Sequence, residues 1–248
     1  MSDPAEPAAK PASYTFSIAT ALIVAGTGFM ENLDGTVIGP ALPAMARDFA
    51  VHPVDLNIGI GAYMLTLGVF IPISGWIADR FGARRVFCAA IAIFTFASLL
   101  CATATTLTGF VVFRVLQGIG GAMMVPVGRL VVLRVAPKER LLEAIALLTW
   151  PTALALVLGP PLGGLITDHA NWRWIFFVNL PLGAIAMIVA WFKVPEAYGE
   201  RRPFDGIGFV LTGISLFALL VAAELMGRAD IDWGRVGLFI VAGLAFGG

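Results

Sequence analysis

Long apolar runs follow one another along nearly the whole chain, and only short polar segments separate them. Each of the eight runs is close to the ~20 residues that an α-helix needs to cross a bilayer. Backbone polar groups cannot stay unpaired in lipid, so only helices or a closed barrel can cross it. The runs are continuous rather than alternating, which favours helices. The predicted spans are 16–43, 57–78, 86–104, 108–134, 142–167, 174–193, 206–226 and 234–248.

The composition also indicates an integral membrane protein. Hydrophobic residues make up 59% of the sequence, the mean hydropathy is +0.90 and 13% of residues are charged, whereas soluble domains carry about 25% charged residues. The formal net charge is zero, so nothing indicates a nucleic-acid partner. Cys88 and Cys101 lie in one apolar run, about 20 Å apart along a helix, and cannot bridge within it. With no cluster of Cys or His, we expect no bound metal.

Basic residues are distributed unequally between the two sides of the predicted bundle, and this bias sets the orientation. One side carries ten of them: Lys10, Arg80, Arg84, Arg85, Arg134, Lys138, Arg140, Lys193, Arg201 and Arg202. The other side carries four: Arg47, Arg173, Arg228 and Arg235. We therefore predict a multi-pass protein of the cell membrane, with its N-terminus in the cytoplasm.

The spacing of the runs predicts the domain organisation. We expect a short disordered cytoplasmic tail at 1–14, an N-terminal six-helix transmembrane bundle at 15–193, a cytoplasmic linker at 194–205 and two additional transmembrane helices at 206–248. The last run ends after about 15 residues with no flanking charge. A membrane protein rarely ends inside hydrocarbon, so we expect the chain to be the N-terminal portion of a longer protein.

Two charged residues inside predicted spans are expected to meet. A charge in a span costs at least ~2.5 kcal/mol, so each is a functional candidate. At 1.5 Å per residue, Asp34 lies about 12 Å and Arg114 about 9 Å from the same membrane surface. A carboxylate beside an arginine can stay charged in a cavity, and a proton or substrate that perturbs the pair would couple the two. The alternative is a static ion pair that holds helices together.

Three other charges in spans are open to more than one interpretation. Glu31 is three residues from Asp34 and shares its helix face, so it is a possible second proton-linked acid or a static charge. Arg129 lies near the depth of Asp79, and we expect a structural ion pair between them. Glu224 is close to the end of its span and is expected to reach the interface.

Glycine and proline are concentrated in two predicted spans. Small residues at 118, 121 and 122 would let another helix approach span 108–134 closely. In the span 142–167, Pro160 and Pro161 remove backbone donors and favour a kink, while glycines follow at 163 and 164. That segment is interpreted either as a packing kink or as a hinge in a moving helix. Pro40 and Pro43 are expected to soften the outer end of the first span.

Several motifs resemble those of the major facilitator superfamily. GWIADRFGARR at 75–85 resembles the signature between its second and third spans, and RVLQGIGGA at 114–122 resembles its span 4 signature. The matching positions of the first are Gly75, Asp79, Arg80, Gly82, Arg84 and Arg85, and those of the second are Arg114, Gln117, Gly118 and Gly121. The fold class implied is an all-α integral membrane helix bundle, with the six N-terminal helices of this family plus two further spans.

Three further segments are similar to one branch of that family, the fourteen-span drug:proton antiporters of EmrB/QacA type. GPPLGG at 159–164 resembles the antiporter signature, with Gly159, Pro160, Gly163 and Gly164 in the matching positions. LDGTVIGPALP at 33–43 and NWRWIFFVNLPLG at 171–183 resemble segments typical of this branch. The sequence departs from the patterns at Gly39, where asparagine is usual, and at Ala155, where glycine is usual.

The resemblance implies proton-coupled efflux by alternating access. Asp34 would carry the proton, Glu31 would be a possible second acid and Arg114 would tune the pair. The segment 75–85 would act as a cytoplasmic gate and 159–164 as a seal or hinge. The implied partners are protons, an amphipathic or drug-like substrate, the lipid bilayer and a C-terminal half; the proton gradient is the energy source and no cofactor is implied.

Two other functional classes remain as alternatives. One is a proton-coupled importer on the same scaffold, against which the antiporter-like GPPLGG segment argues. The other is a membrane fragment that transports nothing without its C-terminal half. An enzyme is the least favoured class, because no serine has His and Asp partners in reach and no phosphate-binding loop follows a strand.

Overall fold

The computed structural model describes residues 18–196, 198–199, 203–226 and 232–247, and all the regular structure in these ranges is helical. The predicted tail at 1–14 and the charges of Lys10, Arg201, Arg202 and Arg228 lie outside the described residues. The helices are α1 (Ile18–Phe49), α2 (Asn57–Phe81), α3 (Ala83–Thr103), α4 (Leu107–Val135), α5 (Leu141–His169), α6 (Trp174–Phe177), α7 (Asn179–Lys193), α8 (Gly206–Met226) and α9 (Trp233–Gly247).

Six of the described helical segments are long and apolar enough to cross a membrane. They correspond to α2, α3, α4, α5, the α6–α7 pair and α8. Helix α1 has ample length, at 32 residues, but Glu31, Asn32 and Asp34 in its middle lower its hydropathy. Helix α9 is apolar but shorter. The eight spans expected from the sequence are therefore all helical where described, although two of them do not meet both requirements.

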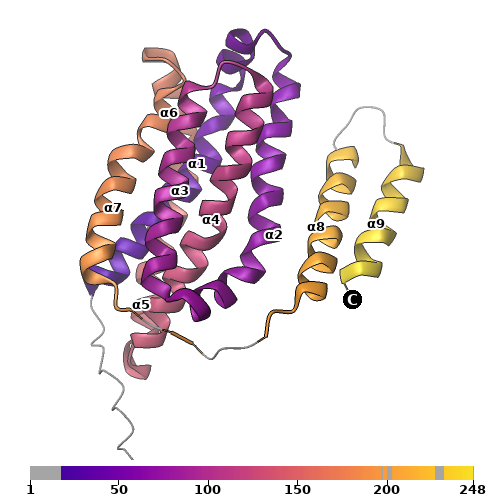
Figure 1. Cartoon of the computed structure of the whole chain (residues 1–248). Helices are drawn as coiled ribbons and strands as arrows, with labels where there is room; N and C mark the ends of the chain where they lie inside the picture. Colours follow the sequence, from indigo (N-terminus) through magenta and orange to yellow (C-terminus); the bar gives the residue numbers. More distant parts are fainter. Residues whose placement is uncertain (1–17, 197, 200–202, 227–231, 248) are drawn as a thin grey trace, which may run out of the picture.

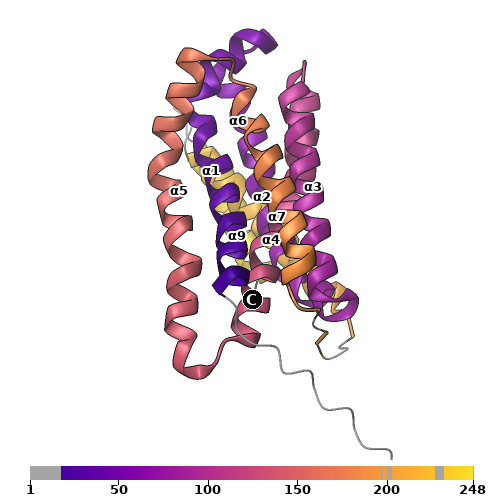
Figure 2. The same ribbon diagram turned by 90° about the vertical axis from the view of Figure 1, so that its left-hand side faces the viewer.

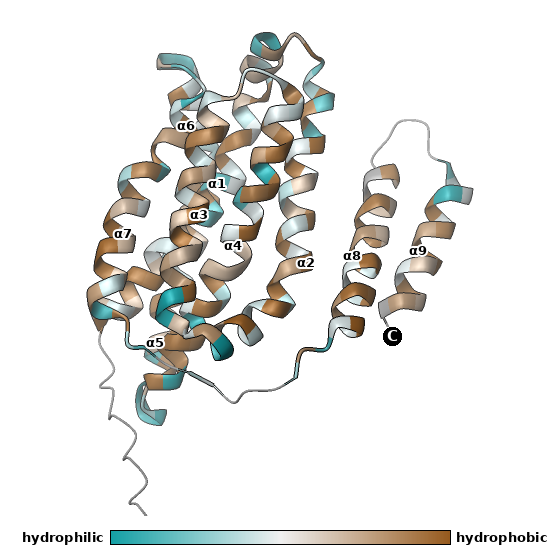
Figure 3. Cartoon of the chain, viewed as in Figure 1, coloured by the Kyte–Doolittle hydropathy of each residue, from teal (hydrophilic) through white to brown (hydrophobic). Residues whose placement is uncertain are grey.

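The long helices stand side by side as a bundle (Figures 1 and 2). Helix α1 packs chiefly on α5, and α4 packs on both α2 and α3. Helix α7 lies against α3 and α1. Helices α8 and α9 form a hairpin beside α2, with α8 making the contact. Many large apolar side chains are exposed, and hydrophilic colour gathers mainly near helix ends (Figure 3), as expected for a surface that meets lipid.

Two helix boundaries differ from the predicted ones. Helix α1 continues through Pro40 and Pro43 to Phe49, because prolines within a membrane helix are tolerated where neighbouring groups satisfy the freed carbonyls. The segment 75–85 is also mostly helical: α2 runs to Phe81 and α3 begins at Ala83. Only Gly82 separates the two helices. Charged residues that looked like a loop in the sequence therefore occupy the ends of two helices.

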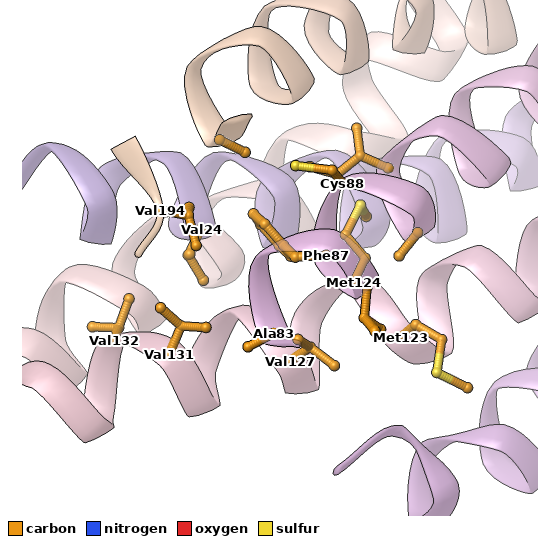
Figure 4. Packing of buried hydrophobic residues seen from close by; sticks show 14 of the residues in the cluster. Val24, Ala83, Phe87, Cys88, Met123, Met124, Val127, Val131, Val132 and Val194 are labelled. Atoms are coloured by element: carbon orange, nitrogen blue, oxygen red, sulfur yellow. The ribbon is translucent and has the colours of Figure 1, made fainter. Parts of the chain in front are cut away.

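The buried apolar residues form two clusters, one in each half of the bundle. The inner cluster, at the end where Gly82 lies, includes Val24, Phe87 and Val127 (Figure 4). The outer cluster, at the opposite end, includes Ile38 and Phe110. Helices α1, α3 and α4 contribute buried apolar residues to both clusters. The residues between these stretches form a layer of their own, and that layer is polar.

Candidate functional site: a buried polar cluster between two apolar cores

The polar layer is centred on an ion pair between α1 and α4. Arg114 Nη1 donates to Asp34 Oδ2 at 2.6 Å, and the two side chains are 0% exposed. A charge transferred alone into this interior would be very costly, so each member of the pair depends on the other. The structure thus brings together the two charges that the depth estimate placed at one level.

The second oxygen of the carboxylate accepts two hydrogen bonds from amides. Gln117 Nε2 and Asn179 Nδ2 each donate to Asp34 Oδ1 at 2.9 Å. The same two amides donate to Ser98 Oγ, at 2.7 and 3.1 Å respectively. Gln117 Oε1 in turn accepts from Arg114 Nη1 at 2.8 Å. These five residues, from α1, α3, α4 and α7, form what we call the Asp34 cluster, in which both oxygens of the Asp34 carboxylate accept hydrogen bonds.

Sequence reasoning missed Ser98 and Asn179. Both are buried, and each lies within an apolar run that has few polar residues. Asn179 stands in the segment 171–183 that was noted only for its resemblance. The available signal was an amide in the middle of a span, because a polar side chain there needs a partner from another helix.

An aromatic ring forms one wall of the Asp34 cluster. The guanidinium carbon of Arg114 lies 4.0 Å from the centre of the Tyr63 ring of α2, a favourable cation–π arrangement. Three buried polar atoms here have no hydrogen-bond partner among the described residues: Arg114 Nε, Arg114 Nη2 and the Tyr63 hydroxyl. The cluster therefore retains donor capacity on the side that faces α2.

Glu31 stands beside the cluster but is not hydrogen-bonded to it. Its side chain is half-buried, and its Oε2 has no partner among the described residues. The carboxylate and the Tyr63 hydroxyl lie against the same patch of α4, since a Cβ added at Gly121 would be 3.5 Å from both. Gly121 thus keeps this region open. Gly118, one turn earlier, meets α2 directly, because a Cβ there would lie 3.0 Å from the Tyr63 carbonyl oxygen.

The antiporter-like segment lies where α5 meets α1. Gly163 is packed so closely on α1 that an added Cβ would overlap the Val37 carbonyl, and Gly159 is packed on Thr36. Gly164 has nothing within 4 Å of such a Cβ, and Pro160 is exposed. Helix α5 is continuous through the segment. The two buried glycines therefore permit a close helix–helix contact. Their partners on α1, Thr36 and Val37, lie two and three residues after Asp34.

The segment 75–85 forms contacts of a different kind at the inner end of the bundle. Gly82 has φ +95°, a conformation that side chains disfavour. Asp79 accepts from Arg134 Nη2 at 2.8 Å. The expected pair between Asp79 and Arg129 is therefore wrong. Residues five apart on a helix differ in direction by about 140°, and the depth estimate could not distinguish their faces.

The stretch that follows α7 packs on the same turn. Arg84 Nε and Arg85 Nε lie 3.4 and 3.6 Å from Glu196 Oε2. Gly199 lies against Asp79. Arg80 lies over the ring of Trp76, 5.5 Å from its centre, and Gly75 has open space around it. The chain after α7 thus covers part of the 75–85 motif. The side chain of Glu224 lies outside the described residues.

Comparison with known protein families gives a match over most of the chain. Residues 24–248 match the model of the Major Facilitator Superfamily. The chain belongs to this superfamily. The members of this superfamily are multi-pass membrane transport proteins and not enzymes.

Two relatives of this superfamily member carry a name that refers to multidrug resistance. MdtD of Enterobacter sp. (strain 638) is 42% identical over 222 residues, which cover 90% of this chain and 47% of the relative. MdtD of Pectobacterium atrosepticum is 43% identical over 202 residues, which cover 82% of this chain and 43% of the relative. The chain thus spans about half the length of the relatives that it matches.

The solved structures that this superfamily member resembles share its fold. A D-xylose–proton symporter matches with a TM-score of 0.64 over 93% of this chain and 66% of that chain, at 14% identity. The peptide transporter PepTSo matches with the same TM-score over 92% of this chain and 54% of that chain, also at 14% identity. At these identities the likeness concerns the arrangement of helices alone.

Proposed function

We propose that the protein is a proton-coupled exporter of amphipathic small molecules, and that Asp34 is the group that takes up and releases the proton. The observation that carries this proposal is the burial of Asp34 and Arg114 as an ion pair within the polar layer between two apolar cores. An ionisable residue at such a depth is costly, and function is the usual reason for keeping it. Four helices contribute to the cluster, so its state affects all of them.

Protonation of Asp34 would change what holds these helices together. A neutral carboxyl no longer compensates the charge of Arg114, which cannot release its own proton. Removing one partner of a buried ion pair costs about 3–5 kcal/mol, enough to shift a two-state equilibrium by more than a hundredfold. A proton could thus convert one helix arrangement into another, as alternating access requires.

The other residues take supporting roles in this mechanism. Gln117 and Asn179 hold the carboxylate oriented toward Arg114. Glu31 is the candidate second acid, because it is half-buried and its Oε2 has no hydrogen-bond partner in the described part of the chain. The 75–85 segment acts as the gate at the inner end. The close contact of Gly159 and Gly163 with α1 seals α5 against the helix that carries Asp34.

The direction of transport and the substrate class are argued from the relatives and motifs. Relatives named for multidrug resistance share 42% and 43% identity with the chain, which favours drug-like substrates. The helices α8 and α9 follow the six-helix bundle, as two central helices would in the fourteen-span branch. Basic residues gather at the inner end of the bundle, which favours the cell membrane with that end in the cytoplasm.

Everted membrane vesicles provide the test. Cells would express the complete protein that contains this chain, and vesicles from them would be energised and given ethidium as a lipophilic probe. We expect accumulation that requires an acidic vesicle lumen, because protons leave the lumen as the probe enters it, and we expect Asp34→Asn to lower this accumulation at least about tenfold with normal membrane insertion. Unchanged accumulation in Asp34→Asn would remove Asp34 from the mechanism. If the vesicles instead lose the probe while protons also leave the lumen, the protein would be an importer.

A further inference from the structure

A groove on the surface of the bundle is separate from the Asp34 cluster. Its volume is about 490 Å³, within the range of small-molecule sites. The apolar residues that line it include Phe70, Ile77, Phe81, Val86, Ile93 and Met123. Helices α2 and α3 form its two walls and α4 its floor. It exists because α2 and α3, joined at Gly82, both pack on α4 more closely than on each other.

The groove opens away from the interior of the bundle. On α4, Ile119 lines the groove and Gln117 belongs to the Asp34 cluster, and residues two apart on a helix point about 200° from each other. Helix α5 lies on the opposite side of the bundle from α3 (Figure 2). Phe81 is 54% exposed. In a bilayer the open side therefore faces hydrocarbon, and an occupant reaches it from the membrane.

One end of the groove carries a positive charge. Among the described residues that line it, Arg85 alone is charged, and its side chain is 66% exposed. Its Nε approaches Glu196 Oε2 at 3.6 Å, which is too long for a hydrogen bond. A guanidinium offers five donors in a fork that fits a phosphate. Arg85 is thus suited to bind an anionic oxygen cluster at the mouth of the groove.

The positions of the charge and the apolar walls match a lipid in the bilayer. Arg85 stands in the first turn of α3, at the end of the helix where phosphates of one leaflet lie. Ile93 is eight residues further on, about 12 Å deeper, which remains within one half of a ~30 Å hydrocarbon core. From the surface inward, the groove therefore presents a cation and then apolar walls, in the same order as a phosphate and its acyl chain.

We infer that this groove binds a glycerophospholipid of the leaflet next to Gly82, with its phosphate on Arg85 and one acyl chain between α2 and α3. The acyl chain comes from bilayer hydrocarbon that is as apolar as the groove, so close packing against the walls, and not removal from water, holds it there. The charged hydrogen bonds to phosphate fix the headgroup. The occupant would fill a space that otherwise separates two walls of the bundle. This inference does not depend on the direction or the substrate of transport.

Photolabelling tests the inference directly. The complete protein would be reconstituted in phosphatidylcholine vesicles with a minor fraction of phosphatidylglycerol that carries a diazirine in the middle of one acyl chain. After irradiation, peptide mass spectrometry would map the label. We expect enrichment of several-fold on residues 86–93 and 119–123 over the exposed faces of α7 and α9. Equal labelling of all lipid-facing helices would overturn the inference.

Two variants separate the headgroup from the acyl chain. Arg85→Gln should lower groove labelling several-fold, whereas Arg85→Lys should keep most of it. Ala89 lines the groove and is exposed, so Ala89→Trp should fill the space and abolish labelling without disturbing the core. Ala223→Trp, at an exposed site on α8, is the matched control. Labelling that survives both Arg85→Gln and Ala89→Trp would refute the site, and excess inorganic phosphate should not compete with the lipid.

Discussion

Asn179 and Asp34 are 145 residues apart in the chain, yet Asn179 Nδ2 donates to Asp34 Oδ1 at 2.9 Å. This hydrogen bond links α7 to α1 at the level of the polar layer. Because Asn179 also donates to Ser98, one amide connects three helices. Any movement of one of these helices relative to the other two must therefore change the surroundings of this amide.

Asn179→Leu should destabilise the protein by about 1–3 kcal/mol, because it leaves buried acceptors with fewer donors. Transport should fall less than in Asp34→Asn, since Arg114 and Gln117 still hold the carboxylate. Thermal unfolding in detergent and ethidium transport would measure both effects. Asn32→Leu is the matched control, because the Asn32 side chain donates to the Gly28 carbonyl of its own helix and makes no hydrogen bond to another helix within the described residues. Equal losses in the two variants would show that the Asn179 bond has no special importance.

Arg114→Lys should lower transport about tenfold or more although it preserves the charge. Lysine has no planar fork, so it cannot serve Asp34 and Gln117 as the guanidinium does, and it loses the stacking on Tyr63. Initial rates of ethidium transport at a fixed proton gradient would measure the change. Arg129→Lys, at an exposed position of the same helix, is the control. Normal transport in Arg114→Lys would leave Arg114 only a structural role.

Gly163→Ala should destabilise the protein by about 1–3 kcal/mol, because the new Cβ would force α5 away from the backbone of α1. Gly164→Ala is an adjacent control with open space around the added carbon, and its effect should stay within about 0.5 kcal/mol. The difference in unfolding temperature between the two variants checks the prediction. If Gly164→Ala proved the more harmful, the contact between α5 and α1 would differ from the one described.

Asp48 gives the outer end of the bundle a dependence on pH. It lies beyond the predicted span, and hydrogen bonds from Trp172 and then Arg173 lower the pKa of its carboxyl below the ordinary 3.8. A folded-state pKa below the unfolded one means that the stabilisation is complete above about pH 4 and is lost as the pH falls through the lower value. Asp48→Asn should therefore lower the unfolding temperature at pH 7 and flatten its decline below pH 4. A decline as steep as in the unmodified protein would assign that titration to other acids.

Helices in the described part of the chain could be predicted from the sequence because apolar runs of about 20 residues leave few alternatives. Their ends could not. Asp79 and Arg80 looked like loop residues, but long polar side chains at a helix end can extend into the interface and the helix need not stop. Pro40 and Pro43 looked like the end of α1, but a proline removes only one donor and neighbouring helices can compensate for it.

The ion pair at the centre of the site was predictable for a similar reason. Asp34 and Arg114 are long-range partners, but depth is nearly linear in residue number within a span, so their levels could be compared. Depth carries no information about rotation, which is why the pair expected between Asp79 and Arg129 was wrong and Arg134 is the partner of Asp79. Ser98 and Asn179 need knowledge of which helices adjoin, and that comes only from the packing.

A single residue, Gly82, joins helices α2 and α3, which are each more than twenty residues long. With no loop to take up slack, any change in tilt between α2 and α3 must pass through the two dihedral angles of Gly82. A small rotation at Gly82 produces a displacement that grows with distance along the helices and is largest at their far ends. The width of the space between α2 and α3 is therefore set by the backbone dihedral angles of Gly82.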